Sequence, residues 1–162
     1  MLRTVGKGSA LAVLLVDMLK GVAAILQARW LFAWLQAPSA WLPWFVRLCG
    51  FAVLLGHSRS IWLGFTGGKS AATGLGVLLG MSWPVGAGAA AVFLVVLALV
   101  RIVSLASMLA AAMAALLVCL LPEPLAYRLL VVAGGLYVIA LHRANIARLL
   151  AGTEPRIGRS SR

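Results

Sequence analysis

Acidic residues are scarce in this chain of 162 residues, which has three Asp and Glu against fourteen Lys and Arg. Three carboxylates cannot form the oxygen-rich cluster that a hard metal ion requires. Five residues after the two histidines stand Trp62 and Ala147, so there is no His-x-x-x-x-Asp box, and no Gly-x-Ser-x-Gly elbow occurs. Cys49 and Cys119 lie in apolar runs without a nearby His or Cys. We expect both thiols to be buried and unpaired, and we predict no metal site, no cofactor and no Ser-His-Asp triad.

Charged side chains of either sign are also few, at 10% of the chain, whereas 64% of the residues are hydrophobic. Soluble domains are about 45–50% apolar and about 25% charged, and a soluble fold of this size could not bury so much apolar surface. The sequence therefore predicts an all-α protein with a single polytopic transmembrane domain over residues 1–162. We expect residues 156–162 to form a disordered tail.

Long apolar runs supply the candidate spans of that domain. A straight span needs about 20 residues, so the second and third runs are short, and the third, which is rich in Gly and Ala, is the least secure. We predict about six spans, at Ala10–Leu35, Trp41–Leu55, Ala71–Met81, Pro84–Val100, Ile102–Leu121 and Pro124–Leu141.

Positive charge is abundant, with a net charge of +11. In a soluble protein this would suggest nucleic acid, but here the basic residues lie mostly between apolar runs, which indicates positive-inside topology and contact with anionic lipid headgroups. We therefore expect a bilayer and no nucleic acid as partner, with both termini cytoplasmic. In that orientation Arg29, Arg47 and Arg128 lie outside. The basic residues on the cytoplasmic side are Arg3, Lys7, Arg59, Lys69, Arg101, Arg143, Arg148, Arg156, Arg159 and Arg162.

A glycine-rich loop, Gly64-Phe65-Thr66-Gly67-Gly68-Lys69-Ser70, interrupts the apolar sequence. It is not a Walker A loop, because only three residues separate Gly64 from Gly68 and no βαβ pattern surrounds it. Backbone amides, Lys69 and the hydroxyls of Thr66, Ser70 and Thr73 suit a phosphate. The alternative is a glycine-rich packing turn.

Charged and polar residues on two helices need a partner as well. Asp17 and Lys20 are three residues apart within an apolar run, so they share a helical face, and we expect an ion pair that supports a neighbouring loop. Near the other end, His142, Asn145 and Arg148 follow each other at intervals of three and form a polar stripe where the last span leaves the membrane. The alternative for this stripe is a basic helix that contacts headgroups.

These motifs together resemble the PlsY-type acyl-phosphate:glycerol-3-phosphate acyltransferase family over essentially the whole chain. A weaker set, Arg101-x-x-Ser104-x-x-Ser107, fits the same pattern, although its serines alone would read as helix caps or partners of backbone carbonyls. The shared motifs are Asp17-x-x-Lys20-Gly21, Gly56-His57, Phe65-Thr66-Gly67-Gly68-Lys69-Ser70-Ala71-Ala72-Thr73, and His142 through Glu154.

The chain departs from that family at two places. Thr66 and Ser70 stand where the family commonly has Lys or Arg before the glycines and Gly after the lysine, so one charge of the loop is lost. The family also begins with a further helix and a motif resembling Gly-Ser-Gly-Asn-x-Gly-Ala-Thr-Asn, and this sequence starts at Met1-Leu2-Arg3-Thr4, inside the tail of that motif. We therefore expect the seven-span fold without its first helix and most of the first motif, through a misassigned start, a fragment or an impaired protein.

The resemblance implies transfer of a fatty acyl group from acyl phosphate to the 1-hydroxyl of sn-glycerol 3-phosphate, giving lysophosphatidic acid and phosphate. This is the first step of phospholipid biosynthesis, and the resemblance places it at a bacterial-type plasma (inner) membrane with cytoplasmic loops. The alternatives are a non-catalytic anion-binding or transport protein, a structural membrane subunit, or an inactive truncated acyltransferase.

The resemblance also implies roles for individual residues. Lys69, His142 and Asn145 are the catalytic candidates, and the base for the attacking hydroxyl is either His142 or a phosphate oxygen of the substrate. Arg3 is expected to pair with a second phosphate. The remaining substrate-binding candidates are Gly67, Gly68, Thr73, Ser107 and Arg148, and the structural supports are Asp17, Lys20, His57 and Glu154.

Overall fold

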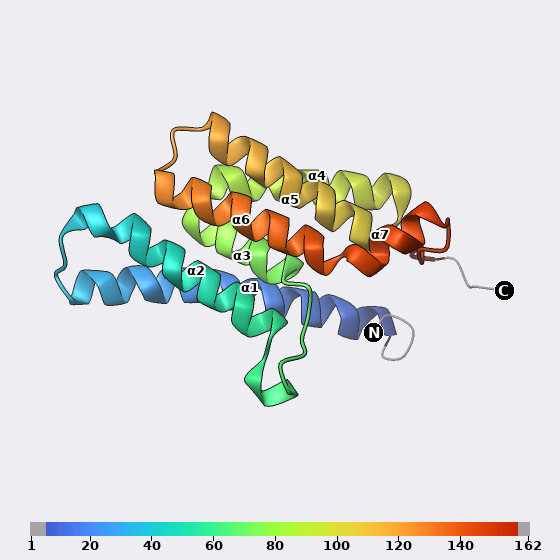
Figure 1. Ribbon diagram of the computed structural model, residues 1–162, viewed down its shortest axis with the longest axis horizontal. Helices are drawn as coiled ribbons and strands as arrows, with labels where there is room; N and C mark the ends of the chain where they lie inside the picture. The colour runs from blue at the N-terminus through green and yellow to red at the C-terminus, as the bar shows by residue number, and fades with distance from the viewer. Residues whose placement is uncertain (1–5, 159–162) are drawn as a thin grey trace. The chain divides into compact units, whose positions relative to one another are not determined.

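The computed structural model describes residues 6–158, and within them the predicted apolar runs are all helices (Figure 1). The elements are α1 (Gly6–Trp34), η1 (Ser39–Trp41), α2 (Leu42–Ser58), η2 (Ile61–Leu63), α3 (Ala71–Met81), α4 (Trp83–Val100), α5 (Val103–Leu120), α6 (Leu125–Leu141) and α7 (Arg143–Leu150). The described residues include no strand, only an isolated bridge between Ser60 and Thr66. The all-α prediction is confirmed.

Length and apolar composition separate these helices into those that meet the criterion for a straight membrane span and those that do not. Four helical segments are long and apolar enough, and α6 with α7 counts as a fifth if the pair, bent by 57°, forms one span. The third predicted run, α3, has only 11 residues, well short of the ~20 that a straight span needs. All six predicted segments are therefore helices, but at most five of them meet this criterion.

The chain divides into two compact units, one up to Gly86 and one from Ala87 onward. In the first unit α1 packs most closely against α3 and also contacts α2. Glycines allow the close approach, because a Cβ on Gly21 would overlap the Thr73 carbonyl and a Cβ on Gly76 would overlap the Met18 carbonyl. Small residues at helix contacts are typical of packing in membranes.

The second unit is built around the antiparallel pair α5 and α6. A Cβ on Gly135 of α6 would lie 3.4 Å from the Ala111 carbonyl of α5, and a Cβ on Gly88 of α4 would overlap the Leu117 side chain of α5. The first distance is an ordinary van der Waals contact, whereas at Gly88 the Leu117 side chain fills the space that a Cβ would take. The single domain over residues 1–162 stays a prediction, since each unit is compact by itself.

Many large apolar side chains point away from the protein, as a bilayer requires. Leu94 on α4 is 63% exposed and Leu120 on α5 is 71% exposed, and a water-soluble protein rarely presents apolar surface on this scale. Cys49 and Cys119 are unpaired, as expected, but our expectation that they are buried was wrong. Cys49 is half-buried and Cys119 is exposed, because a small thiol is compatible with a lipid-facing position.

Candidate active site

The glycine-rich loop lies in the connection between α2 and α3, which extends beyond the ends of both helices (Figure 1). After α2 ends, the short helix η2 turns the chain back, with Gly64 and Phe65 both in the left-handed region at φ 60° and 61°. The loop then returns to α2, where the Gly68 N–H donates to the His57 carbonyl at 3.2 Å. The loop is thus fastened to the last turn of α2.

Both adjacent glycines are required by that return path. A Cβ on Gly67 would overlap the His57 carbonyl oxygen, and a Cβ on Gly68 would overlap Nε2 of the His57 ring. The glycines therefore do what the packing-turn alternative demands. They also leave the exposed Lys69 at the end of the loop, where a phosphate-binding lysine would stand.

Two of the three hydroxyls near the loop donate hydrogen bonds to backbone carbonyls. Thr66 Oγ1 donates to the Leu63 carbonyl at 2.6 Å, and Ser70 Oγ, which is fully buried, donates to the Leu54 carbonyl at 2.8 Å. Ser70 has φ 58° and precedes the first residue of α3. Each hydroxyl thus donates to a backbone carbonyl of the turn, and its suitability for a phosphate stays a prediction. Thr73 is fully buried and its Oγ1 has no hydrogen-bond partner, so as a substrate-binding residue it stays a prediction.

Asp17, Lys20 and His57 form a chain of contacts that ends at the loop. Lys20 Nζ lies 2.5 Å from Asp17 Oδ1, which is the predicted ion pair. The same Nζ lies 2.7 Å from His57 Nδ1, and the opposite side of the His57 ring packs on Gly68. The pair on α1 is therefore connected to the loop through His57.

His142 lies at the bend between α6 and α7, which the sequence did not predict. The His142 N–H bonds to the Ile139 carbonyl at 2.9 Å, three residues back, while its ring Nδ1 takes the Val138 carbonyl, four residues back, at 2.8 Å. In a regular helix the His142 N–H would donate to the Val138 carbonyl. Here the ring takes that place, and a side chain that inserts into the helical hydrogen bonds is a recognised cause of a kink. Because a carbonyl only accepts, Nδ1 carries the proton and Nε2 carries the lone pair.

Glu154 gathers three donors in the second unit. Its Oε1 accepts from Ser104 Oγ and Asn145 Nδ2, both at 2.6 Å, and its Oε2 accepts from Arg148 Nε at 2.7 Å. Its side chain is only 6% exposed. Burial acts to raise the pKa of this carboxyl, but the three hydrogen bonds and the charge of Arg148 outweigh it and lower the pKa below the ordinary 4.5. The carboxylate is therefore ionised and fixes the Asn145 amide.

The structure brings the predicted Asn145, Arg148 and Glu154 together around α7, and His142 precedes this helix at the bend, where its backbone carbonyl accepts the Asn145 N–H. Both His142 and Asn145 are buried, as is Ser107 on α5. Sequence reasoning missed the contact of Ser104, whose hydroxyl donates to Glu154 rather than to a backbone carbonyl. The signal in the sequence was Glu154 itself, one of only three acidic residues in a strongly basic chain. Arg3 lies outside the described residues.

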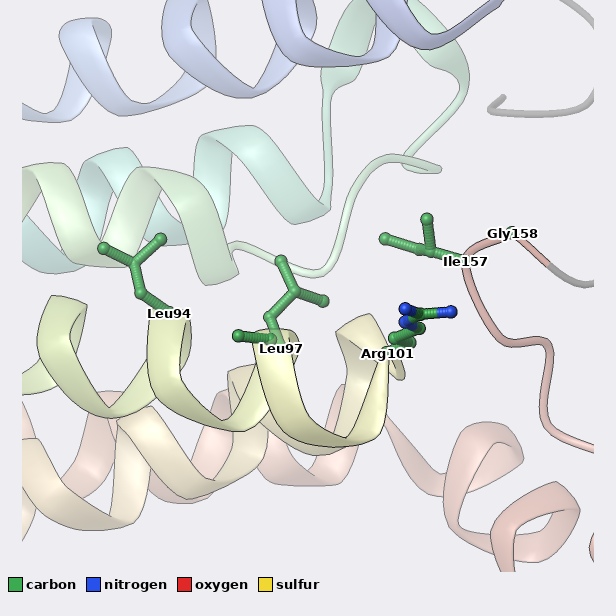
Figure 2. Close-up of a pocket in the computed structure, with 6 residues that line it drawn as sticks. Leu94, Leu97, Arg101, Ile157 and Gly158 are labelled. Carbon is green, nitrogen blue, oxygen red and sulfur yellow. The ribbon is translucent and has the colours of Figure 1, made fainter.

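A shallow apolar hollow of about 470 Å³ lies beside the break between α4 and α5 (Figure 2). It is lined by Leu94, Leu97 and Ala98 of α4 and by Ile157 of the C-terminal segment. Arg101, the first residue after α4, has φ 61°, and its carbonyl accepts the Ile157 N–H at 2.8 Å. Part of the segment expected to be a disordered tail therefore makes a defined contact at this break.

Comparisons with known proteins show what this chain is similar to. The family model described as glycerol-3-phosphate acyltransferase matches residues 1–152. Glycerol-3-phosphate acyltransferase 2 of Rhizobium johnstonii is 63% identical over 98% of this chain and 77% of its own length. The enzyme of Trichormus variabilis is 52% identical over 97% of this chain and 74% of its own.

Two solved structures of PlsY (YgiH), described as an integral membrane glycerol 3-phosphate acyltransferase, are also similar. The lysophosphatidic acid form has a TM-score of 0.85 and the glycerol 3-phosphate form one of 0.86, each at 33% identity. They cover 97% of this chain, and 76% and 75% of the solved chains respectively. The predicted resemblance is confirmed: the chain belongs to the glycerol-3-phosphate acyltransferase family and is a multi-pass membrane enzyme of phospholipid biosynthesis.

Proposed function

We propose that this acyltransferase takes its acyl group from acyl phosphate and transfers it to the 1-hydroxyl of sn-glycerol 3-phosphate, giving lysophosphatidic acid and inorganic phosphate. The observation that carries the acceptor is the likeness to the PlsY structure in its glycerol 3-phosphate form, over 97% of this chain. The donor is our own inference, and it rests on the chemistry that the side chains can perform.

Acyl phosphate is a mixed anhydride, so its phosphate leaves without strong acid catalysis and without a covalent enzyme nucleophile. Among the described residues we find no Ser-His-Asp triad, and Glu154 is occupied by three donors. Positioning can supply about 7–11 kcal/mol of rate acceleration, and preorganised donors stabilise the developing oxyanion. An activated acyl donor therefore suits a site that contains cations, amides and one basic nitrogen.

Gly67, Gly68 and Lys69 are proposed to hold one phosphate. The Gly68 N–H is already bonded to His57, so its role is to bring the loop close rather than to donate to the anion. Lys69 supplies the positive charge. Arg3, beyond the described residues, is proposed to pair with the second phosphate through its planar guanidinium.

His142, Asn145, Ser107 and Arg148 are proposed to orient glycerol 3-phosphate. The Val138 carbonyl holds the proton of His142 on Nδ1, so Nε2 is the nitrogen that can accept the proton of the attacking hydroxyl. A phosphate oxygen of the substrate is the alternative base. A bell-shaped rate profile that loses its acidic limb in His142→Gln supports the histidine, and an unchanged profile supports the phosphate.

We further propose that the enzyme lies in a bacterial-type plasma (inner) membrane with the glycine loop, α7 and both termini in the cytoplasm. Ten basic residues against three favour this orientation. It requires six crossings, so it includes the proposal that the short α3, together with its flanking residues, completes one of them. Single-cysteine labelling of Arg59→Cys and Arg128→Cys, each in a background lacking Cys49 and Cys119, tests it. Protection of Arg59→Cys from an impermeant reagent in intact cells supports it, and labelling of that position contradicts it.

The central test is acyl transfer by Lys69→Ala in isolated membranes, with palmitoyl phosphate and labelled glycerol 3-phosphate. We expect a loss of about a hundredfold or more, because a charge-assisted contact made to the reacting phosphate disappears. Arg59→Ala is the matched control, since Arg59 is an exposed cation of the same connection, and it should retain activity. Full turnover by Lys69→Ala would overturn the site, and equal turnover with acyl-coenzyme A would overturn the donor.

A further inference from the structure

The His57 side chain touches both the ion pair of α1 and the glycine loop. Its Nδ1 lies 2.7 Å from Lys20 Nζ, and its Nε2 faces the α-carbon of Gly68. The ring is mostly buried, with 15% of the side chain exposed. Nδ1 is therefore occupied by Lys20, whereas Nε2 is directed at the loop.

The partners of Lys20 decide which ring nitrogen carries the proton. Lys20 Nζ donates to Asp17 Oδ1 at 2.5 Å, and a lysine ammonium donates hydrogen bonds and cannot accept them. Nδ1 of His57 must then present its lone pair to Lys20, and a proton on Nδ1 would place two donors against each other. Asp17 Oδ1 is 3.8 Å from Nδ1, too far to stabilise such a proton by a hydrogen bond. The ring is neutral, with its proton on Nε2.

Three donors of the loop are already used within the turn. The Gly68 N–H donates to the His57 carbonyl, and the hydroxyls of Thr66 and Ser70 donate to backbone carbonyls. A donor at Gly68 would have to come from another group. No hydrogen bond to His57 Nε2 is made within residues 6–158, and this N–H lies against Gly68.

We propose that His57, held in the Nε2–H tautomer by Lys20, is a further phosphate-binding residue that donates to the phosphate at the Gly67–Lys69 loop. This inference rests on the proposed function, in which the loop holds a substrate phosphate. The same chemistry would recognise the phosphate of glycerol 3-phosphate or that of acyl phosphate. The two sources differ in which substrate's binding depends on His57.

Two substitutions separate this role from mere support of the loop. His57→Asn keeps an oxygen near Nδ1 that can accept from Lys20 but has no group at the position of Nε2. His57→Gln is long enough to place an amide N–H at that position. A residue that only fills space beside Gly68 would be affected by both changes, whereas a donor is restored by glutamine.

The measurement is steady-state kinetics in membranes for each substrate in turn. For His57→Asn we expect KM for one of the two phosphates to rise about ten- to a hundredfold, as for a lost hydrogen bond to a charged group, with kcat nearly unchanged. His57→Gln should stay within about threefold of the parent, since its amide donates in place of the ring. The substrate whose KM rises identifies the phosphate.

Lys20→Met gives an independent variant, because it removes the donor to Nδ1 and lets the ring proton move away from Nε2. We expect the same KM to rise, by a smaller factor than in His57→Asn. Unchanged KM values in His57→Asn would overturn the inference, and so would equal losses in His57→Asn and His57→Gln. If the parent enzyme turns over and Lys69→Ala does too, the proposed loop function fails instead, which keeps the two failures distinguishable.

Discussion

The two histidines of this chain are held in opposite ways. His57 is fixed by a cation, so its Nδ1 accepts from Lys20 and its proton lies on Nε2. His142 is fixed by a carbonyl, so its Nδ1 donates to Val138 and its lone pair lies on Nε2. One Nε2 is thus a donor, suited to an anion, and the other is an acceptor, suited to a hydroxyl.

The comparison extends to the surroundings of each ring. In the first unit, the Asp17–Lys20 pair on α1 fixes the tautomer of His57, which packs against the glycine loop. In the second unit, Glu154 fixes the orientation of the Asn145 amide. Asn145 lies one turn after His142, whose ring causes the kink between α6 and α7. The same residue type therefore serves two purposes, and the difference comes from the atom that Nδ1 meets.

The second unit should be the more sensitive to a single change. Glu154→Ala leaves Ser104, Asn145 and Arg148 without their shared acceptor, and we expect a cost of roughly 2–4 kcal/mol and loss of nearly all acyl transfer. Thermal unfolding in detergent and membrane activity assays measure both. Glu154→Gln is the control and should be intermediate, because it keeps an acceptor for Ser104 and Asn145. Parental stability in Glu154→Ala would contradict the account of this cluster.

The fold and the sites were predictable to different degrees. Six helices followed from six apolar runs, and the Asp17–Lys20 pair followed from a spacing of three, because both are local properties of the chain. The kink at His142 was not predictable, since no proline or glycine marks it and its cause is a side chain competing for the Val138 carbonyl. The contact of Ser104 with Glu154 spans 50 residues, and no periodicity reports such a contact.

In the first unit, glycine substitutions test whether the loop depends on His57. Gly68→Ala would place a Cβ on the His57 ring, whereas a Cβ on Gly56, one residue before His57, meets nothing within 4 Å. We expect Gly68→Ala to lower kcat/KM about tenfold or more, as is typical when a reacting group is misplaced, and Gly56→Ala to retain activity. Equal kcat/KM values for the two variants would contradict a loop that depends on His57.

The smallest expected effect is the pH dependence of the Glu154 cluster. Its carboxyl has a lowered pKa in the folded protein, so its stabilisation is complete above the unfolded pKa and is lost as the pH falls through the folded pKa. The difference in melting temperature between the parent and Glu154→Gln should stay constant near neutral pH and shrink only below about 4.5. A difference that shrinks already between pH 7 and 5 would contradict the lowered pKa.

The most direct test of the central claim is the ¹⁵N spectrum of the enzyme labelled at histidine, in detergent or bilayers at neutral pH. The chain has only two histidines, so His57→Gln assigns both sets of signals. We predict a protonated Nε2 for His57 and a protonated Nδ1 for His142, with Lys20→Met disturbing the first and leaving the second unchanged. The same tautomer in both rings, or an imidazolium at position 57, would contradict it.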